Sequence, residues 1–122
     1  MVAAAEEKMN ALILKLDGLL RGQGIEFVLV VLPTERDIER DEYGDLRNLQ
    51  GLVDFCHSNG IATIEVKPYF IEQLTKGNSE LDDLFWPIDY HFTPLGYRHM
   101  GEAIQQGLCE LKPDMAQQLC SP

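Results

Sequence analysis

The stretch from Asp89 to Ile104, DYHFTPLGYRHMGEAI, contains an aspartate and a histidine two positions apart. In an extended loop, side chains at positions i and i+2 project to the same side, so the Asp89 carboxylate can reach a ring nitrogen of His91. A histidine that a carboxylate orients can act as a general base. The competing interpretation is that Asp89 binds local backbone amides and His91 makes a structural hydrogen bond. Asp89 and His91 are therefore the candidate catalytic residues.

Three further residues are candidates for substrate binding. Thr34 and Arg36 follow the first predicted strand at its carboxyl end, where α/β proteins usually bind ligands, and Arg36 can hold an anionic group. Trp86 stands beside Pro87 and can form the wall of a pocket. The alternatives are that Thr34 and Arg36 belong to a solvated loop and that Trp86 anchors a long loop to the core.

A metal site is an alternative use of the same region. Asp89 and His91 would combine with His99 and Glu102, which lie at i and i+3 on one predicted helix face. Catalytic zinc needs three converging protein ligands. Exposed polar residues on a helix explain His99 and Glu102 better, so we expect no metal and no cofactor.

Composition excludes two classes of partner. Lys plus Arg total 10 and Asp plus Glu total 20, a formal net charge of −10, which is unsuited to nucleic acid or to an anionic membrane surface. The longest apolar run, Phe27 to Leu32, is far too short to span a bilayer. The first ten residues lack both the basic and the apolar regions of a secretory signal. These features predict a cytoplasmic protein.

The cysteines have no motif spacing. Cys56, Cys109 and Cys120 match no CxxC pattern for metal or redox chemistry. An odd count favours thiols in a reducing compartment over a disulfide scaffold. Cys56 falls within an apolar helical pattern and is expected in the core.

Hydrophobic periodicity predicts an α/β protein of one domain. Two apolar segments, about residues 26–32 and 61–66, read as strands, and the helical crossover between them implies a small parallel sheet. The stretch after Pro33 is charged and is predicted as a loop that can include a short helical turn. The stretch around 79–89 is also predicted as a loop. We expect a domain over 1–112 and a loosely ordered tail over 113–122. The predicted flanking helices cover about residues 4–21, 46–58, 68–76 and 94–111.

The 89–104 stretch resembles the last signature block of the SGNH (GDSL-type) hydrolase superfamily. In that family an Asp and a His lie two or three apart in a loop before the final helix. Pro94, Gly96 and Tyr97 match the positions that follow, and so does the run from Gly101 to Ile104. The resemblance implies that Asp89 orients His91, which takes a proton from a serine that attacks an acyl carbonyl.

The layout upstream of this block also agrees. FVLVVLPT resembles the penultimate core strand of the family, and GIATIEV resembles its last strand. The resemblance covers about residues 24 to 110, and only the 89–104 block is fairly specific. It implies a truncated three-layer architecture, the C-terminal half of such a hydrolase.

The nucleophile-bearing half of the family pattern is missing. The family places its serine in a GDS-like turn and adds a Gly and an Asn as oxyanion donors, and none of these motifs is present. The serines here, Ser58, Ser79 and Ser121, do not stand between a strand and a helix. Cys56 and His57 are candidates for an unconventional site by residue type alone.

Three functions remain open. The first is an SGNH-like domain that is non-catalytic alone and is completed by self-association or by a partner. A two-fold homodimer pairing the Phe27–Leu32 strands would make one continuous sheet. The second is an esterase or acyl-transfer enzyme that takes a small acyl or ester ligand and whose nucleophile is supplied elsewhere. The third is an interaction module with no small-molecule site.

Overall fold

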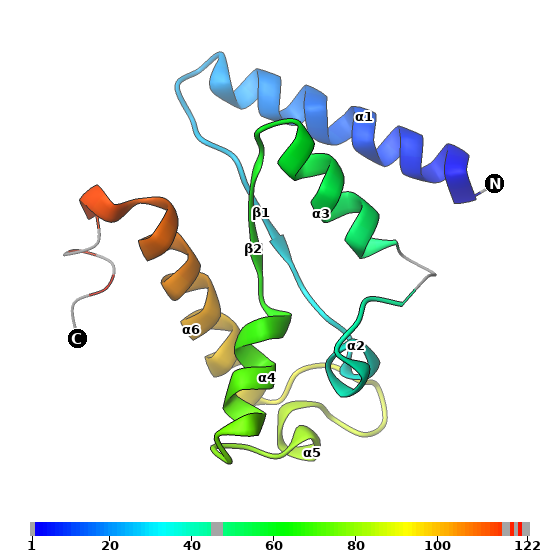
Figure 1. The fold of residues 1–122 in the computed structure, drawn as a ribbon, viewed down its shortest axis with the longest axis vertical. Coiled ribbons are helices and arrows are strands. Elements are labelled where there is room, and N and C mark those ends of the chain that lie inside the picture. Colours follow the sequence, from blue (N-terminus) through cyan, green and yellow to red (C-terminus); the bar gives the residue numbers. More distant parts are fainter. Residues whose placement is uncertain (1, 45–47, 116–117, 119, 121–122) are drawn as a thin grey trace.

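The computed structural model describes residues 2–44, 48–115, 118 and 120. Figure 1 shows a small parallel sheet flanked by helices, so the predicted α/β class is confirmed. The elements are α1 (Val2–Arg21), β1 (Val28–Val31), α2 (Glu35–Arg40), α3 (Leu49–Ser58), β2 (Ala62–Glu65), α4 (Lys67–Thr75), α5 (Leu81–Leu84), α6 (Pro94–Leu111) and a 3-10 turn at Pro113–Met115.

The sheet has the predicted parallel order with shorter strands. β1 pairs with β2 in a register that runs from Val28 opposite Ala62 to Val31 opposite Glu65. Helix α3 lies between them in the chain as the crossover that a parallel pair requires. Four residues per strand make a narrow sheet, so side chains from the helices must provide most of the core.

The two faces of the sheet pack against separate apolar clusters. Neighbouring β1 residues point to opposite faces, so Leu29 packs with one cluster and Val30 with the other. The smaller cluster lies with α1 and α3 and is built from Ile13, Cys56 and Ile61. The larger cluster lies with α4 and α6 and supports the loop before α6. Its buried members are Ile38, Val66, Phe70, Leu84, Phe85 and Ala103.

Two segments predicted as loops contain helices. Residues Glu35–Arg40 form α2, which begins with a capping box: the Thr34 hydroxyl accepts from the Asp37 amide at 3.2 Å and the Asp37 carboxylate accepts from the Thr34 amide at 2.7 Å. Residues Leu81–Leu84 form the single turn α5. The loop prediction was wrong for Leu81–Leu84, and the segment after Pro33 forms a six-residue helix where a loop with a possible short helical turn was predicted. In both segments local capping and the burial of Ile38 and Leu84 outweigh the charge of their neighbours.

Other boundaries moved by a few residues. The predicted start of the second helix at residue 46 lies outside the described residues, and α3 begins after Asn48, whose side chain accepts from the Gly51 amide. Helix α4 starts one residue earlier than predicted, whereas α6 has its predicted bounds, Pro94 to Leu111. Proline at the first helical position and a capping threonine, Thr93, fix the start of α6.

The apolar face of α1 is mostly uncovered. Met9, Leu12, Leu16 and Leu19 are exposed, although the periodicity places them on one face with Ile13. Ile13 is buried, at 6% exposure, because it alone among them reaches the cluster around Cys56 and Ile61.

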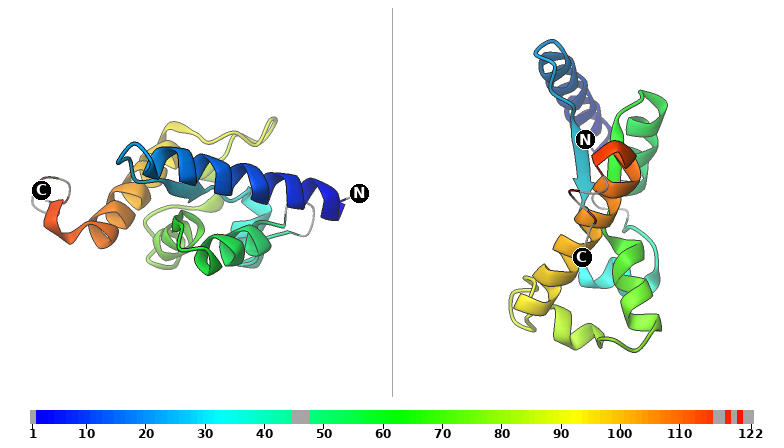
Figure 2. Two further views of the ribbon diagram at one scale, coloured as in Figure 1. Left: turned by 90° about the horizontal axis from the view of Figure 1, so that it is seen from above. Right: turned by 90° about the vertical axis from the view of Figure 1, so that its left-hand side faces the viewer.

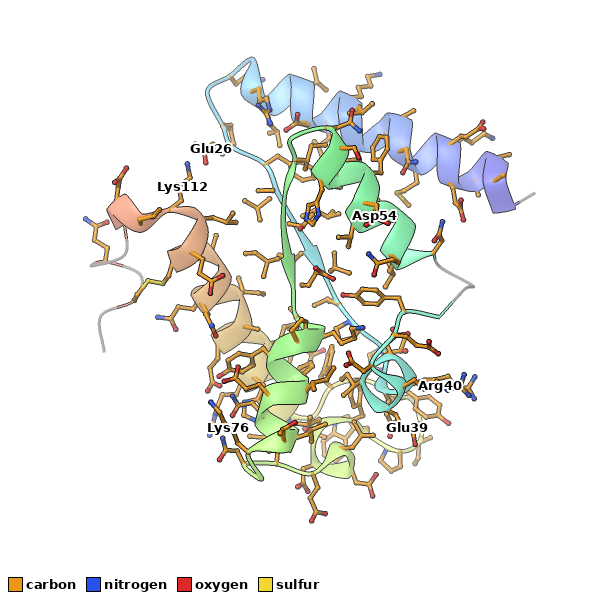
Figure 3. The ribbon with its side chains drawn as sticks, in the orientation of Figure 1. Glu26, Glu39, Arg40, Asp54, Lys76 and Lys112 are labelled. Atoms are coloured by element: carbon orange, nitrogen blue, oxygen red, sulfur yellow. A yellow bond between two sulfur atoms is a disulfide. The ribbon has the colours of Figure 1, made fainter. Side chains whose placement is uncertain are left out.

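The C-terminal end of α6 is tied to the rest of the chain twice. A disulfide joins Cys109 to Cys120, with 6.1 Å between the Cα atoms, so the expectation of free thiols was wrong for this pair. An odd cysteine count permits one bridge and one free residue, here the buried Cys56. Lys112 forms an ion pair with Glu26, and Figure 3 shows these two side chains pointing toward one another. Parts of the predicted tail (116–117, 119 and 121–122) lie outside the described residues.

Within the part of the chain that the structure describes, no helix combines the length and the apolar character that crossing a membrane requires.

Candidate functional site

Asp89 and His91 lie in a tight loop closed by backbone hydrogen bonds. An antiparallel bridge between Phe85 and Phe92 closes the base of the loop. The Trp86 amide donates to the His91 carbonyl at 2.8 Å, and the Tyr90 amide donates to the Trp86 carbonyl at 3.0 Å. Tyr90 has φ 59°, a left-handed conformation that reverses the chain between the aspartate and the histidine.

The predicted pair is formed. His91 Nδ1 lies 3.3 Å from Asp89 Oδ2, and the His91 backbone amide donates to Asp89 Oδ1 at 3.1 Å. One carboxylate therefore caps the loop and contacts the ring, which combines both interpretations of the sequence. The His91 amide is the main cause that lowers the pKa of Asp89, and the His91 ring adds to it. Both side chains are largely exposed, with relative exposures of 73% for His91 and 57% for Asp89.

A cleft of about 550 Å³ lies at the carboxyl end of β1, and neither Asp89 nor His91 is among the described residues that line it. Thr34 and Arg36 line it as predicted, and so does Tyr90, which stands between Asp89 and His91. Trp86 is half exposed and is not among the described residues that line the cleft. The complete lining is Pro33, Thr34, Glu35, Arg36, Glu39, Phe85, Tyr90 and Phe92.

The cleft has an aromatic floor and a charged rim. Phe85 and Phe92 stack with centroids 4.8 Å apart and continue into the larger core cluster. Arg36 and Glu39 come from α2, on which Figure 3 labels Glu39. The arrangement can hold a small, partly apolar molecule whose polar end meets Thr34 or Arg36.

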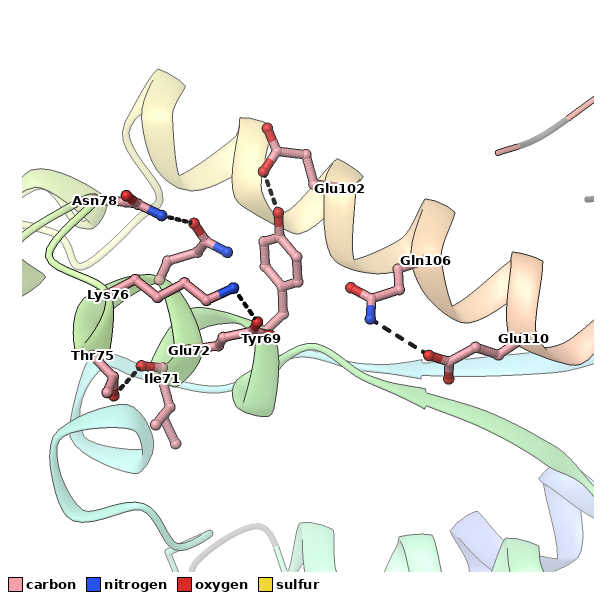
Figure 4. Close-up of polar contacts among 10 residues, drawn as sticks. Tyr69, Ile71, Glu72, Thr75, Lys76, Asn78, Glu102, Gln106 and Glu110 are labelled. Atoms are coloured by element: carbon pink, nitrogen blue, oxygen red, sulfur yellow. Dashed lines mark hydrogen bonds and ion pairs between the residues drawn. The ribbon is translucent and has the colours of Figure 1, made fainter. Parts of the chain in front are cut away.

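A second series of polar contacts runs through the packed part of the domain. The Ser79 hydroxyl lies 2.9 Å from His99 Nε2, and His99 Nδ1 lies 3.1 Å from Glu102 Oε2. Glu102 also accepts a 2.5 Å hydrogen bond from the Tyr69 hydroxyl, which Figure 4 shows bridging α4 and α6. A carboxylate only accepts, so Nδ1 carries a proton, and in a neutral ring Nε2 then accepts from the serine hydroxyl.

This series has the order of a serine, a histidine and a carboxylate, but its setting is that of a structural network. Ser79 is 9% exposed and His99 is 6% exposed, and the contacts satisfy polar groups that packing removes from water. Together they join α4, the loop before α5, and α6. The sequence analysis considered His99 and Glu102 as metal ligands and preferred to explain them as exposed polar residues. That preferred interpretation was wrong for His99, which is buried at 6% exposure. In the structure the two side chains contact each other and not Asp89 or His91.

Among the described residues, no group of three His, Cys, Asp or Glu side chains is arranged to hold a metal ion. Ser79 was missed as a partner of His99 because it lies 20 residues away through a loop, and only the packed structure brings the two together.

Replacing Tyr69 by phenylalanine should make the free energy of unfolding decrease less at high pH than it does in the wild type. Burial and the hydrogen bond to Glu102 raise the pKa of Tyr69 to about 12, from 10.0. A raised pKa means that the stabilisation is complete below pH 10 and is lost as pH rises toward 12. Urea unfolding between these pH values should show a smaller decrease for Tyr69→Phe than for wild type. Equal decreases would show that the phenol does not couple to folding.

No family model, no curated protein and no solved structure matches this chain.

Proposed function

We propose that this chain is an SGNH-like domain that contributes the acid–base half of an acyl-transfer site and is non-catalytic alone. One observation carries the proposal: Asp89 and His91 contact each other on a loop whose central residue, Tyr90, lines the cleft at the carboxyl end of β1. In this role the cleft binds a small acyl ester.

The pair supplies two of the functions that acyl transfer needs. Asp89 accepts from Nδ1–H of His91, which fixes the ring tautomer and stabilises the imidazolium that forms. The other ring nitrogen, Nε2, then takes the proton of an attacking hydroxyl and returns it to the leaving group. This role requires an ionised carboxylate, and the lowered pKa of Asp89 agrees with that requirement.

In this proposal the nucleophile is supplied from outside the residues that the structure describes. Ser58 ends α3, Ser79 is held by His99, and Ser121 lies outside the described residues. Completion at the free edge of β1, by a second copy pairing through Phe27–Leu32 or by a different partner, would place new groups next to the cleft.

Ester hydrolysis tests this function through His91. The purified chain alone should hydrolyse p-nitrophenyl acetate at the same background rate as its His91→Ala variant. The chain recovered with its partner under native conditions should lose roughly 100- to 10,000-fold in rate on His91→Ala, the contribution of a general base. Ile88→Ala is the control, because Ile88 lies in the same loop and is 92% exposed.

Two outcomes would contradict the proposal. Hydrolysis by the lone chain that depends on His91 would show that the domain needs no completion. If the complex does not hydrolyse the ester, or hydrolyses it at a rate that His91→Ala leaves unchanged, acyl transfer is not its function.

A further inference from the structure

The rim of the cleft carries more negative than positive charge. Glu35 and Glu39 line it, and Arg36 is the one basic side chain among the described residues that do so. Glu35 and Glu39 are four positions apart in α2, so they lie next to each other on one side of the helix. Two like charges at this spacing repel and destabilise a helix. A cation held in the cleft would relieve this repulsion.

No internal partner explains the two carboxylates. Within the part of the chain that the structure describes, neither Glu35 nor Glu39 forms an ion pair or a side-chain hydrogen bond. Glu35 opens α2, where a negative charge interacts favourably with the helix dipole, whereas Glu39 lies in the last turn, where it does not. The charge of Glu39 is therefore available to a ligand.

Aromatic rings form much of the remaining wall. Phe85, Tyr90 and Phe92 come from the loop between α5 and α6 and line the cleft together with residues of α2. The left-hand view of Figure 2 shows this loop (yellow) projecting from the body of the domain, and its Tyr90 is 67% exposed. The faces of aromatic rings are electron-rich and attract cations. Rings and carboxylates therefore favour the same kind of ligand, a positively charged one.

We propose that the cleft binds the ester of a small quaternary ammonium alcohol. The inference rests on the proposed function, because it names the class of ester that the site takes. The trialkylammonium group lies between the aromatic rings and Glu39, and the ester carbonyl accepts a hydrogen bond from the Thr34 hydroxyl. The oxygen of that hydroxyl accepts from the Asp37 amide at 3.2 Å, which leaves its proton free to donate.

The aromatic wall selects an alkylated ammonium group over a bare one. The side chains of Phe85 and Phe92 contain no oxygen or nitrogen acceptor, so a primary ammonium would lose hydrating water there without a replacement. The methyl groups of a quaternary ammonium need no hydrogen bond and bring the charge directly to the rings. The cleft volume of about 550 Å³ is within the range of small-molecule sites.

Arg36 makes an anionic ligand the alternative. A guanidinium can bind a carboxylate, and Arg36 forms no ion pair within the described residues. Glu35 and Glu39 outnumber it in the cleft. The formal net charge of −10 also raises the concentration of cations near the surface and lowers that of anions. These charges favour the cationic ligand.

A matched pair of esters tests the charge of the ligand. Acetylcholine and 3,3-dimethylbutyl acetate have the same shape, but the second has a neutral carbon where the first has the ammonium nitrogen. Each ester is titrated into the purified full chain, and the NMR shifts of the ring protons of Tyr90 and Phe92 give its Kd. We expect acetylcholine to bind at least about tenfold more tightly, a ratio that a cation–π contact and a nearby carboxylate can produce together.

Substitutions locate the ammonium group in the cleft. Glu39→Gln should weaken the binding of acetylcholine about threefold, the size expected for an exposed charge pair, and leave the neutral ester unchanged. Arg36→Gln removes the opposing charge and should tighten acetylcholine. Glu42→Gln is the matched control, because Glu42 is exposed and is not among the described residues that line the cleft. It should change neither affinity, and unchanged circular dichroism shows that each variant folds.

Three results would overturn the inference. The first is equal affinity for the two esters, or no shift with acetylcholine. The second is an equal loss for Glu39→Gln and Glu42→Gln, which would assign the binding to the overall charge of the chain. The third is tighter binding of butyrate than of acetylcholine, lost on Arg36→Gln.

Binding by the lone chain requires no nucleophile, so it is measured separately from hydrolysis. If acetylcholine binds as expected but hydrolysis by the complex does not depend on His91, the cation site is retained and acyl transfer is rejected. If hydrolysis of p-nitrophenyl acetate depends on His91 but the two esters bind equally, the proposed function is retained and this substrate class is rejected.

Discussion

Replacing Gly96 by alanine should destabilise the domain by about 3 kcal/mol, the upper range for overpacking a tight site. A Cβ at this position would clash with the carbonyl oxygen of Leu84 and come within 3.1 Å of the Phe92 ring. The carbonyl cannot move freely, because it accepts a hydrogen bond from the Thr93 amide at 3.0 Å. Gly96 thus allows the first turn of α6 to pack directly on the end of α5.

Gly101→Ala is the matched control for this change. Gly101 lies in the same helix, and a Cβ added there would meet no atom within 4 Å beyond its own helical turns. Alanine at this position should therefore stabilise α6 by up to about 1 kcal/mol through helix propensity. Urea unfolding followed by circular dichroism measures both variants. Similar midpoints for Gly96→Ala and wild type would show that the close approach of α5 and α6 is absent in solution.

Truncation of Phe70 should cost about 3–5 kcal/mol, the range for removing a large buried aromatic ring. Phe70 is fully buried, and its ring lies 5.6 Å from that of Phe92 and 6.3 Å from that of His99. It therefore supports both the floor of the cleft and the network of His99. Because small domains are stable by only about 5–15 kcal/mol, Phe70→Ala should remove a large share of the free energy of unfolding and lower the urea midpoint accordingly.

Ile88→Ala provides the comparison, since Ile88 is 92% exposed and its loss removes no core contact. Its unfolding free energy should stay within about 0.5 kcal/mol of wild type. If Phe70→Ala unfolded at the same urea concentration as Ile88→Ala, the cluster around Phe70 would not be the core of the domain.

The sequence predicts the elements that carry their own boundary signals. Helix α6 was predicted with correct bounds because Pro94 opens it and Pro113 prevents its extension. Helix α2 was predicted only as a possible short turn within a loop, because the charged run resembles a solvated loop, although Thr34 and Asp37 form a capping box that can be recognised in the sequence. Capping residues and prolines therefore predict where a helix begins or ends reliably. The overall charge of a segment is a poorer guide to whether that segment forms a helix.

Contacts within a few residues of each other were also predictable. The contact of Asp89 with His91 was predicted from their spacing, although it forms across a turn at the left-handed Tyr90 and not in the extended loop that the prediction assumed. The position of Thr34 and Arg36 in the cleft follows from the end of β1. Contacts that depend on packing could not be predicted. Periodicity shows that Leu12 and Leu16 share a side of α1, but it does not show whether another element covers that side.

The open edge of β1 also has a consequence for handling the isolated chain. Phe27–Leu32 is an uncharged, β-branched and apolar segment of the kind that assembles into amyloid-like fibrils when left unpaired. Glu26 and Pro33 flank it, and such gatekeeper residues oppose the stacking of further chains by charge and by the missing amide of proline. Colloidal stability of the lone domain then depends on these two positions and on its acidic surface, and added salt, which screens that charge, favours precipitation.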